Sequence, residues 1–333
     1  MARPIDRPER IASGFFAAEV LSRIAALDEV EVELVFDPTS RFEAFAVHKA
    51  RKTYQIRLSQ SVSERIHGLY NSLPASVKRE MRDCLRPGFP MLSVITAIRV
   101  HVILLLMMHE LCHLMLGHFG GEAEALYRSS LGYTKLRELE ADGSAIYLLF
   151  RTAPMLQKYL APDPDYSEQL RSFRRRQRAA MRKTVLFSSV LASLDWDSSA
   201  DPSSRDDYSS FFRSRLVAAV IVHMQLSKPR TIGYDWKSNT ILCRNKRAVL
   251  QFFHAEVLPV LQWCQVATDK AKMRLSFTEK QDCNGGGETI SQTVLSCVLL
   301  GVPLGESAQG INELSGHLRR WYGTLGTRRG VWG

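Results

Sequence analysis

Hydrophobic and polar residues alternate with a period of two near the N-terminus, after a first segment with helical periodicity. Residues 9–27 form the predicted helix, and apolar and mostly acidic positions then alternate over residues 30–36 as in a half-buried strand. Two more alternating stretches cover residues 45–47 and 54–58. The pattern therefore predicts three short strands, which we expect to form a small antiparallel sheet.

Beyond residue 61 the spacing of apolar residues predicts helices almost throughout, separated by breaks that contain Pro or Gly. The most apolar helix includes the run from Val102 to Leu116. Charged residues and histidines interrupt the wider stretch 91–119, so no uncharged run approaches the about 20 residues that a bilayer crossing needs. We expect a buried core helix and no membrane association.

This apolar helix contains the pentapeptide His109-Glu110-Leu111-Cys112-His113. Residues four apart lie on one helix face, so His109 and His113 can offer two imidazole nitrogens to one Zn²⁺ ion. Glu110 is turned by about 100° from His109. This position favours a role as general base, which takes a proton from water, over a role as third metal ligand. The alternative is a pair of hydrogen-bonded core histidines, but buried ionisable groups are rare unless paired or metal-bound.

A third metal ligand is expected in the acidic segment 137–145, downstream of this helix. Glu138 and Asp142 share a helix face at a spacing of four, whereas Glu140 lies about 200° round from Glu138. We therefore predict Glu138 as the third ligand. Asp142 is predicted to accept the free ring N–H of one metal-binding histidine, and Glu140 is expected to be solvated.

The two motifs together resemble the glutamate-zincin metallopeptidases, in which an HExxH helix is followed by a second helix with the pattern ExxAD. The matching residues are His109, Glu110, His113, His118, Glu138, Glu140, Ala141, Asp142 and Ala145. Within this group the chain most resembles the Lit family of phage-exclusion proteases, which are soluble proteins of similar size with short strands ahead of the motif helix. The resemblance spans residues 29–225.

The resemblance implies a dormant cytoplasmic protease that a phage component activates and that cleaves a translation factor such as elongation factor Tu. Related proteases help to hold the substrate oxyanion with a His-Pro pair, where this chain has Asp201 followed by Pro202. An aspartate cannot stabilise an oxyanion, so another group must do so in an active enzyme. The candidates are Tyr208, Arg205, Arg213 and His223, of which we take Tyr208 as the predicted catalytic residue; this stretch could equally be a surface loop.

The 333-residue chain has a net charge of +10, and part of this charge lies in the arginine-rich segment 171–183. Its arginines recur at helical spacing and could dock nucleic acid, but no nucleic-acid motif accompanies them and a solvated helix face is the commoner explanation. The six cysteines show no disulfide spacing and the N-terminus lacks a secretory signal, so we expect a cytoplasmic protein. Cys112 could touch the metal weakly, although a small residue in a tight contact is the simpler interpretation.

We therefore predict an α+β, predominantly helical protein with a zincin-like metallopeptidase domain at residues 1–225. Residues 226–333 are expected to form a helical C-terminal region packed on the core, with a hairpin within 232–242 and helices at 251–272 and 291–304. The expected function is zinc-dependent cleavage of a protein substrate in phage defence, under the control of a phage-derived or other protein activator. The alternatives are a regulatory protease that cleaves a repressor and a non-catalytic binding protein that keeps the zincin fold.

Overall fold

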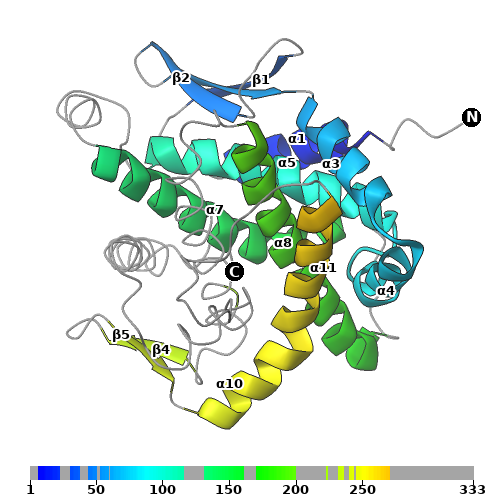
Figure 1. The fold of residues 1–333 in the computed structure, drawn as a ribbon. Helices are drawn as coiled ribbons and strands as arrows, with labels where there is room; N and C mark the ends of the chain where they lie inside the picture. Colours follow the sequence, from blue (N-terminus) through cyan, green and yellow to red (C-terminus); the bar gives the residue numbers. More distant parts are fainter. Residues whose placement is uncertain are drawn as a thin grey trace, which may run out of the picture.

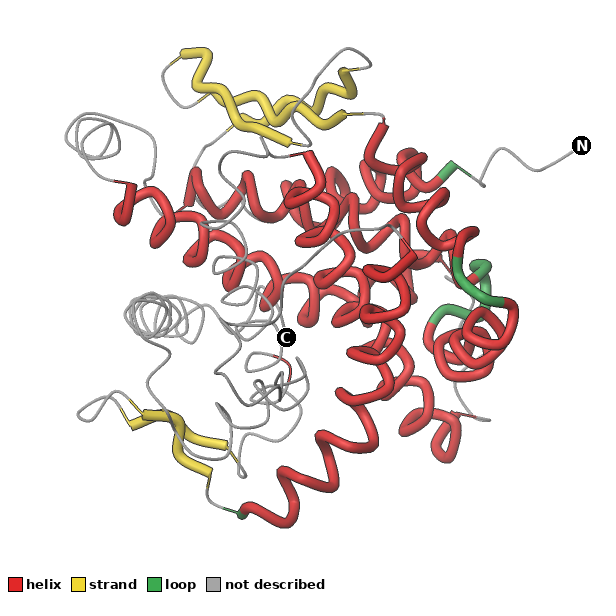
Figure 2. Tube along the Cα trace, in the orientation of Figure 1, coloured by secondary structure: helices red, strands yellow, loops and turns green. Residues whose placement is uncertain are grey.

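The computed structural model places most of the chain in helices, with a small sheet on one side of them (Figures 1 and 2). The residues that it describes are 7–22, 31–37, 44–50, 53–59, 61–115, 131–160, 170–199, 223, 232–235, 240–243 and 245–270. Within these ranges the prediction of a predominantly helical α+β protein is confirmed.

The sheet contains β1 (Glu31–Asp37), β2 (Ala44–Ala50) and β3 (Thr53–Ser59) in the order β1-β3-β2. β2 pairs with β3 antiparallel, but β1 pairs with β3 parallel. The prediction of an antiparallel sheet was therefore wrong for β1. Alternation assigns residues to the two faces of a strand but does not choose the neighbouring strand. Here the most buried strand, with Ile56 and Leu58 in the core, takes the central place.

Three helices and a short turn surround the N-terminal part of the core. The first predicted helix is α1 (Pro8–Phe15), which continues as the π-helical segment η1 (Phe16–Leu21); the remainder of that prediction, from residue 23, lies outside the described ranges. α3 (Ser61–Ser72) and α4 (Ala75–Leu85) follow the sheet, and η2 (Arg86–Gly88) closes α4. α1 buries Ile11 and Phe15 in the core, where it packs against α5 (Val94–Met115).

The core is built around α5 (Val94–Met115), which packs against α7 (Leu131–Leu160) and α8 (Leu170–Ser199). α5 is long and apolar enough to cross a membrane by length and composition alone, and it is the one such helix among the described residues. However, 83% of its most apolar window is buried inside the structure. Burial on this scale confirms the prediction of a buried core helix at this position.

The C-terminal part that the structure describes begins with the predicted hairpin, β4 (Ile232–Asp235) paired antiparallel with β5 (Thr240–Cys243). A nearly continuous helix follows as α10 (Lys246–Phe252), η5 (Phe253–Val257) and α11 (Leu258–Lys270). α11 packs on α8, and its buried Trp263 meets the ring of Phe187 edge to face. The helix predicted at residues 291–304 lies outside the described ranges.

Candidate metal centre

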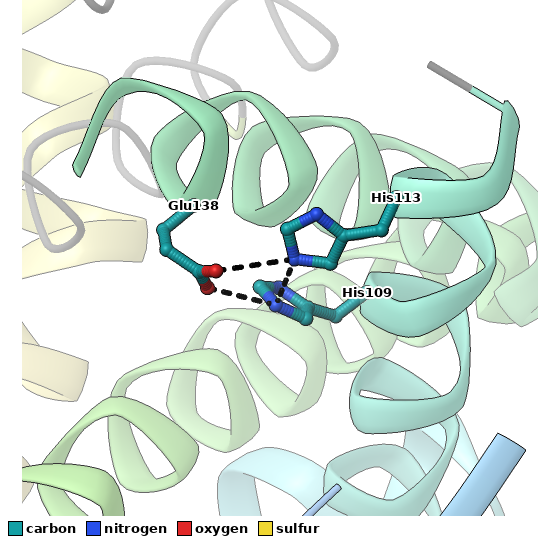
Figure 3. A group of neighbouring side chains, drawn as sticks. All are labelled: His109, His113 and Glu138. Carbon is teal, nitrogen blue, oxygen red and sulfur yellow. Dashed lines mark hydrogen bonds and ion pairs between the residues drawn. The ribbon is translucent and has the colours of Figure 1, made fainter. Parts of the chain in front are cut away.

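Three side chains from two neighbouring helices converge where α5 meets α7: His109, His113 and Glu138 (Figure 3). The two histidine Nε2 atoms lie 2.9 Å apart. Glu138 places Oε2 3.1 Å from His109 Nε2 and Oε1 3.4 Å from His113 Nε2. Tetrahedral ligands at about 2.0–2.1 Å from zinc would lie about 3.3–3.4 Å from one another. The separations are close to this value, so the three predicted ligands form a group that could hold a metal ion.

Small residues on α7 allow this approach of the two helices. Ala141 and Ala145 are fully buried, and Ser144 is 2% exposed. The distance between packed helices depends on the size of the side chains between them. This row of small residues lies just beyond Glu138 in the sequence and lets α7 pack closely along α5.

Asp142 orients one of the two histidines. The ring Nδ1 of His109 donates a hydrogen bond of 2.8 Å to Oδ1 of Asp142. This bond fixes the proton on Nδ1 and leaves the Nε2 lone pair for a metal ion when the ring is neutral. The contact is the one predicted from the spacing of four between Glu138 and Asp142.

The two carboxylates dominate the electrostatics of the centre. Burial alone would lower the pKa of His109, but the charges and hydrogen bonds of Asp142 and Glu138 raise it to about 10. Burial would likewise raise the pKa of Glu138, but hydrogen bonds from His109 and His113 hold it well below its usual range. A pKa of about 10 keeps His109 protonated at neutral pH, so a metal ion must displace this proton. With both histidines then neutral, the two carboxylates leave the centre negatively charged, which favours a cation.

Glu110 lies beside the three converging side chains, on the side of the sheet. Its side chain is buried, and the backbone N–H of Ala46 on β2 donates a hydrogen bond to its carboxylate. Burial raises the pKa of Glu110 to about 7, with a further contribution from Glu138, while His109 and the Ala46 N–H oppose the rise. A carboxyl with a pKa near neutrality can both take up and release a proton at neutral pH. The contact with Ala46 has no signal in the sequence, because strand periodicity does not identify what lies beyond a strand's edge.

Cys112 is not one of the converging side chains that could hold a metal ion. Cys112 is fully buried in α5, and its sulfur is a free thiol. Burial raises the pKa of this thiol strongly, and the carboxylates of Asp142 and Glu110 raise it further. Its full burial makes Cys112 a small packing residue of α5.

Most of the predicted oxyanion-stabilising residues fall on parts of the chain that the structure does not describe. Tyr208, Arg205, Arg213, Asp201 and His118 lie outside the described ranges, and the side chain of Glu140 is likewise not described.

His223, the remaining oxyanion candidate, is described and fully buried. Its ring stacks on Phe150 of α7 and lies against Phe252 of α10. Phe150 follows Glu138 by 12 residues, or about 18 Å along α7. Burial lowers the pKa of His223 to about 3, and nearby positive charges lower it too. This geometry gives His223 a place in the core and argues against a role in holding an oxyanion.

The arginine-rich segment 171–183 lies on α8. Arg176 and Arg178 are exposed, whereas Arg182 forms an ion pair of 3.5 Å with Glu256 of η5. The side chains of residues 171–175 are not described. The C-terminal end of this arginine-rich segment thus helps to join α8 to the C-terminal helices.

No protein-family model, curated protein or solved structure matches the chain. The class of site rests on the residues themselves, which are two histidines one turn apart on α5 and a carboxylate from α7 at a possible metal centre.

Proposed function

We propose that this protein is a zinc-dependent endopeptidase. The observation that carries the proposal is the convergence of His109, His113 and Glu138 next to the buried carboxyl of Glu110. Two imidazole nitrogens and one carboxylate are a ligand set of catalytic zinc sites, which keep a fourth position open. Zn²⁺ held by these three residues would supply Lewis acidity, which activates water and polarises a peptide carbonyl.

Glu110 acts in this proposal as the general base and then as the general acid. Its carboxylate accepts a proton from the attacking water and delivers that proton to the nitrogen of the departing amine. Without an ion, burial raises the pKa of this carboxyl to about 7, and bound Zn²⁺ would lower it, which favours the carboxylate form that a base needs. The hydrogen bond from the Ala46 N–H holds the carboxylate in place between the sheet and α5.

A protein substrate is supported by the position of β2. β2 lies at an edge of the sheet formed by the described strands, and the Ala46 N–H points from this strand to Glu110. An extended peptide can pair with such an edge through main-chain hydrogen bonds.

The biological setting is proposed on the motif resemblance alone. By this resemblance the enzyme cleaves one specific cytoplasmic protein, such as a translation factor, during phage exclusion. A phage-derived component or another protein would then activate it. Cleavage of a repressor is the alternative with the same chemistry.

The test compares the wild-type chain with Glu110→Gln in a bacterial host, with and without phage infection. New protein termini are identified by mass spectrometry, and zinc content is measured on both purified proteins. We expect one abundant protein to be cleaved only by the wild type, with equal zinc in the two proteins. Glu80→Gln, on the exposed surface of α4, is the matched control and should cleave like the wild type. Equal cleavage by Glu110→Gln would refute the proposed base.

A further inference from the structure

An open pocket lies at the other end of the motif helix, between α4 and the first residues of α5. Its volume is about 640 Å³, within the range of about 300–1,000 Å³ typical of small-molecule sites. Val94 lines this pocket and precedes His109 by 15 residues, or about 22 Å along α5. The pocket is therefore a separate feature from the metal centre.

One wall of the pocket carries three cationic side chains, Lys78, Arg82 and Arg86. Lys78 and Arg82 lie one turn apart on the same face of α4, and Arg86 begins the following turn. The ammonium of Lys78 donates a hydrogen bond of 3.1 Å to the backbone carbonyl of Asn71. Among the described residues, neither Arg82 nor Arg86 forms an ion pair.

The acidic residues of α4 lie on a different face of the helix from Lys78 and Arg82. Glu80 and Asp83 both add to the rise in the pKa of Cys84, whose main cause is burial. Glu80 and Cys84 are four residues apart and share a face, about 200° from Lys78. The two signs of charge are thus segregated on α4, and the positive side lines the pocket.

The rest of the pocket lining is mostly apolar. It includes Tyr70, Pro90, Met91 and Leu92. Met91 is 60% exposed and is one of two exposed large hydrophobic residues in the described part of the chain. Arg82 lies close enough to Tyr70 that its charge partly offsets the rise in the tyrosine pKa caused by burial. Cationic and apolar side chains thus line the same pocket.

We propose that this pocket binds a soluble, phosphate-bearing small molecule of nucleotide size. The phosphates would lie against Lys78, Arg82 and Arg86, and the apolar or aromatic part of the ligand against Tyr70 and Met91. Arginine and lysine are the residues that bind phosphate oxygens best. The first turn of α5 adds a small positive potential at the same place, although the three cations suffice without it.

The test is isothermal titration of the full chain with adenosine triphosphate, inorganic triphosphate and adenosine, in excess Mg²⁺ and at low salt. We expect both triphosphates to bind, adenosine triphosphate more tightly, and the binding to weaken at high salt because charges in an open pocket are screened. The same titration with Glu138→Ala separates this pocket from phosphate binding at the metal centre. An unchanged affinity in that variant is expected.

Two charge reversals on α4 provide the decisive comparison. Arg82→Glu should weaken triphosphate binding at least about tenfold, whereas Arg79→Glu, an exposed residue on another face of the helix, should change it less than about twofold. Circular dichroism checks that both variants fold, and Arg86→Gln replaces Arg82→Glu if that variant does not. Equal weakening by both reversals would overturn the proposal. The proposal would also be overturned if neither triphosphate bound to the protein. Phosphatidylglycerol vesicles are titrated in parallel, and binding to the vesicles alone would likewise overturn it.

Discussion

The Nδ1–H of His109 donates a 2.8 Å hydrogen bond to the carboxylate of Asp142, and this pair joins the two helices of the candidate metal centre. His109 and His113 are one turn apart on α5, and Glu138 and Asp142 are one turn apart on α7. The Glu138 carboxylate contacts the Nε2 atoms of both histidines, while Asp142 binds Nδ1 on the opposite side of the His109 ring. The two helices therefore supply both the ligands and the group that orients them.

Replacing Asp142 by Ala is expected to weaken zinc binding about 10–100-fold, because His109 loses the acceptor that fixes its tautomer and ring orientation. The dissociation constant is measured by competition with a chelating dye. Asp83→Ala, at an exposed position of α4, is the control and should bind zinc as the wild type does. An Asp142→Ala protein with the affinity of the wild type would show that the hydrogen bond has no part in metal binding.

The third ligand is distinguished by a pair of neighbouring substitutions. Glu138→Gln should lower the zinc content of the purified protein markedly, because a neutral amide is a poorer ligand than a carboxylate and does not balance the charge of the ion. Glu140→Gln, two residues further on, should leave one zinc per chain. Elemental analysis after dialysis gives both values. The assignment fails if the zinc content falls in Glu140→Gln and not in Glu138→Gln.

Two glycines should respond to alanine in opposite directions. A Cβ on Gly88 would lie 2.8 Å from the backbone N of Met181 and 3.0 Å from the backbone C of Ala180, and neither backbone atom can swing aside. Gly88→Ala is therefore expected to lower the free energy of unfolding by about 1–3 kcal/mol. Gly68, inside α3, has nothing within 4 Å of the position that a Cβ would take, so Gly68→Ala should raise that free energy by about 0.5–1 kcal/mol.

Urea denaturation measures both glycine variants. A loss of stability in Gly68→Ala similar to that in Gly88→Ala would mean that the packing of η2 against α8 is not the cause.

His101 should make stability depend on pH. Its buried ring donates from Nδ1 to the Ala97 carbonyl and meets Phe89 edge to face. Burial lowers its pKa from 6.5 to about 4. Above pH 6.5 the ring is neutral in both states, so it contributes no pH dependence. Between pH 6.5 and 4 only the unfolded chain takes up the proton, so stability falls, by on the order of 3 kcal/mol once pH 4 is reached.

The measurement compares the wild type with His101→Asn, which keeps a donor for the Ala97 carbonyl but cannot titrate. The difference in their unfolding free energy should be constant above pH 7. It should move in favour of the variant by on the order of 3 kcal/mol between pH 6.5 and 4. Other groups titrate in both proteins and cancel in this difference. A difference that stays constant over the whole range would contradict the assignment.

Helical periodicity predicts which side chains share a face within each helix, because a helix face repeats at a spacing of four. That the two faces meet was expected from the motif pattern, and only the fold shows the convergence. His109 and His113 share one face of α5, and the same rule separates Glu138 from Glu140. The parallel pairing of β1 with β3 could not be predicted this way, since alternation is the same in parallel and antiparallel strands. The contact between Glu110 and Ala46 depends on how the sheet docks on α5, which is a tertiary property with no local signal.

X-ray absorption spectroscopy of the zinc-loaded chain tests the metal centre most directly. We predict one zinc per chain with two imidazole nitrogens at about 2.0–2.1 Å, carboxylate oxygen at about 2.0–2.2 Å and no sulfur. His113→Ala should lose one imidazole from this shell or lose the metal altogether. A sulfur ligand at about 2.3 Å, or a chain that retains no zinc with all three ligands intact, would contradict this prediction.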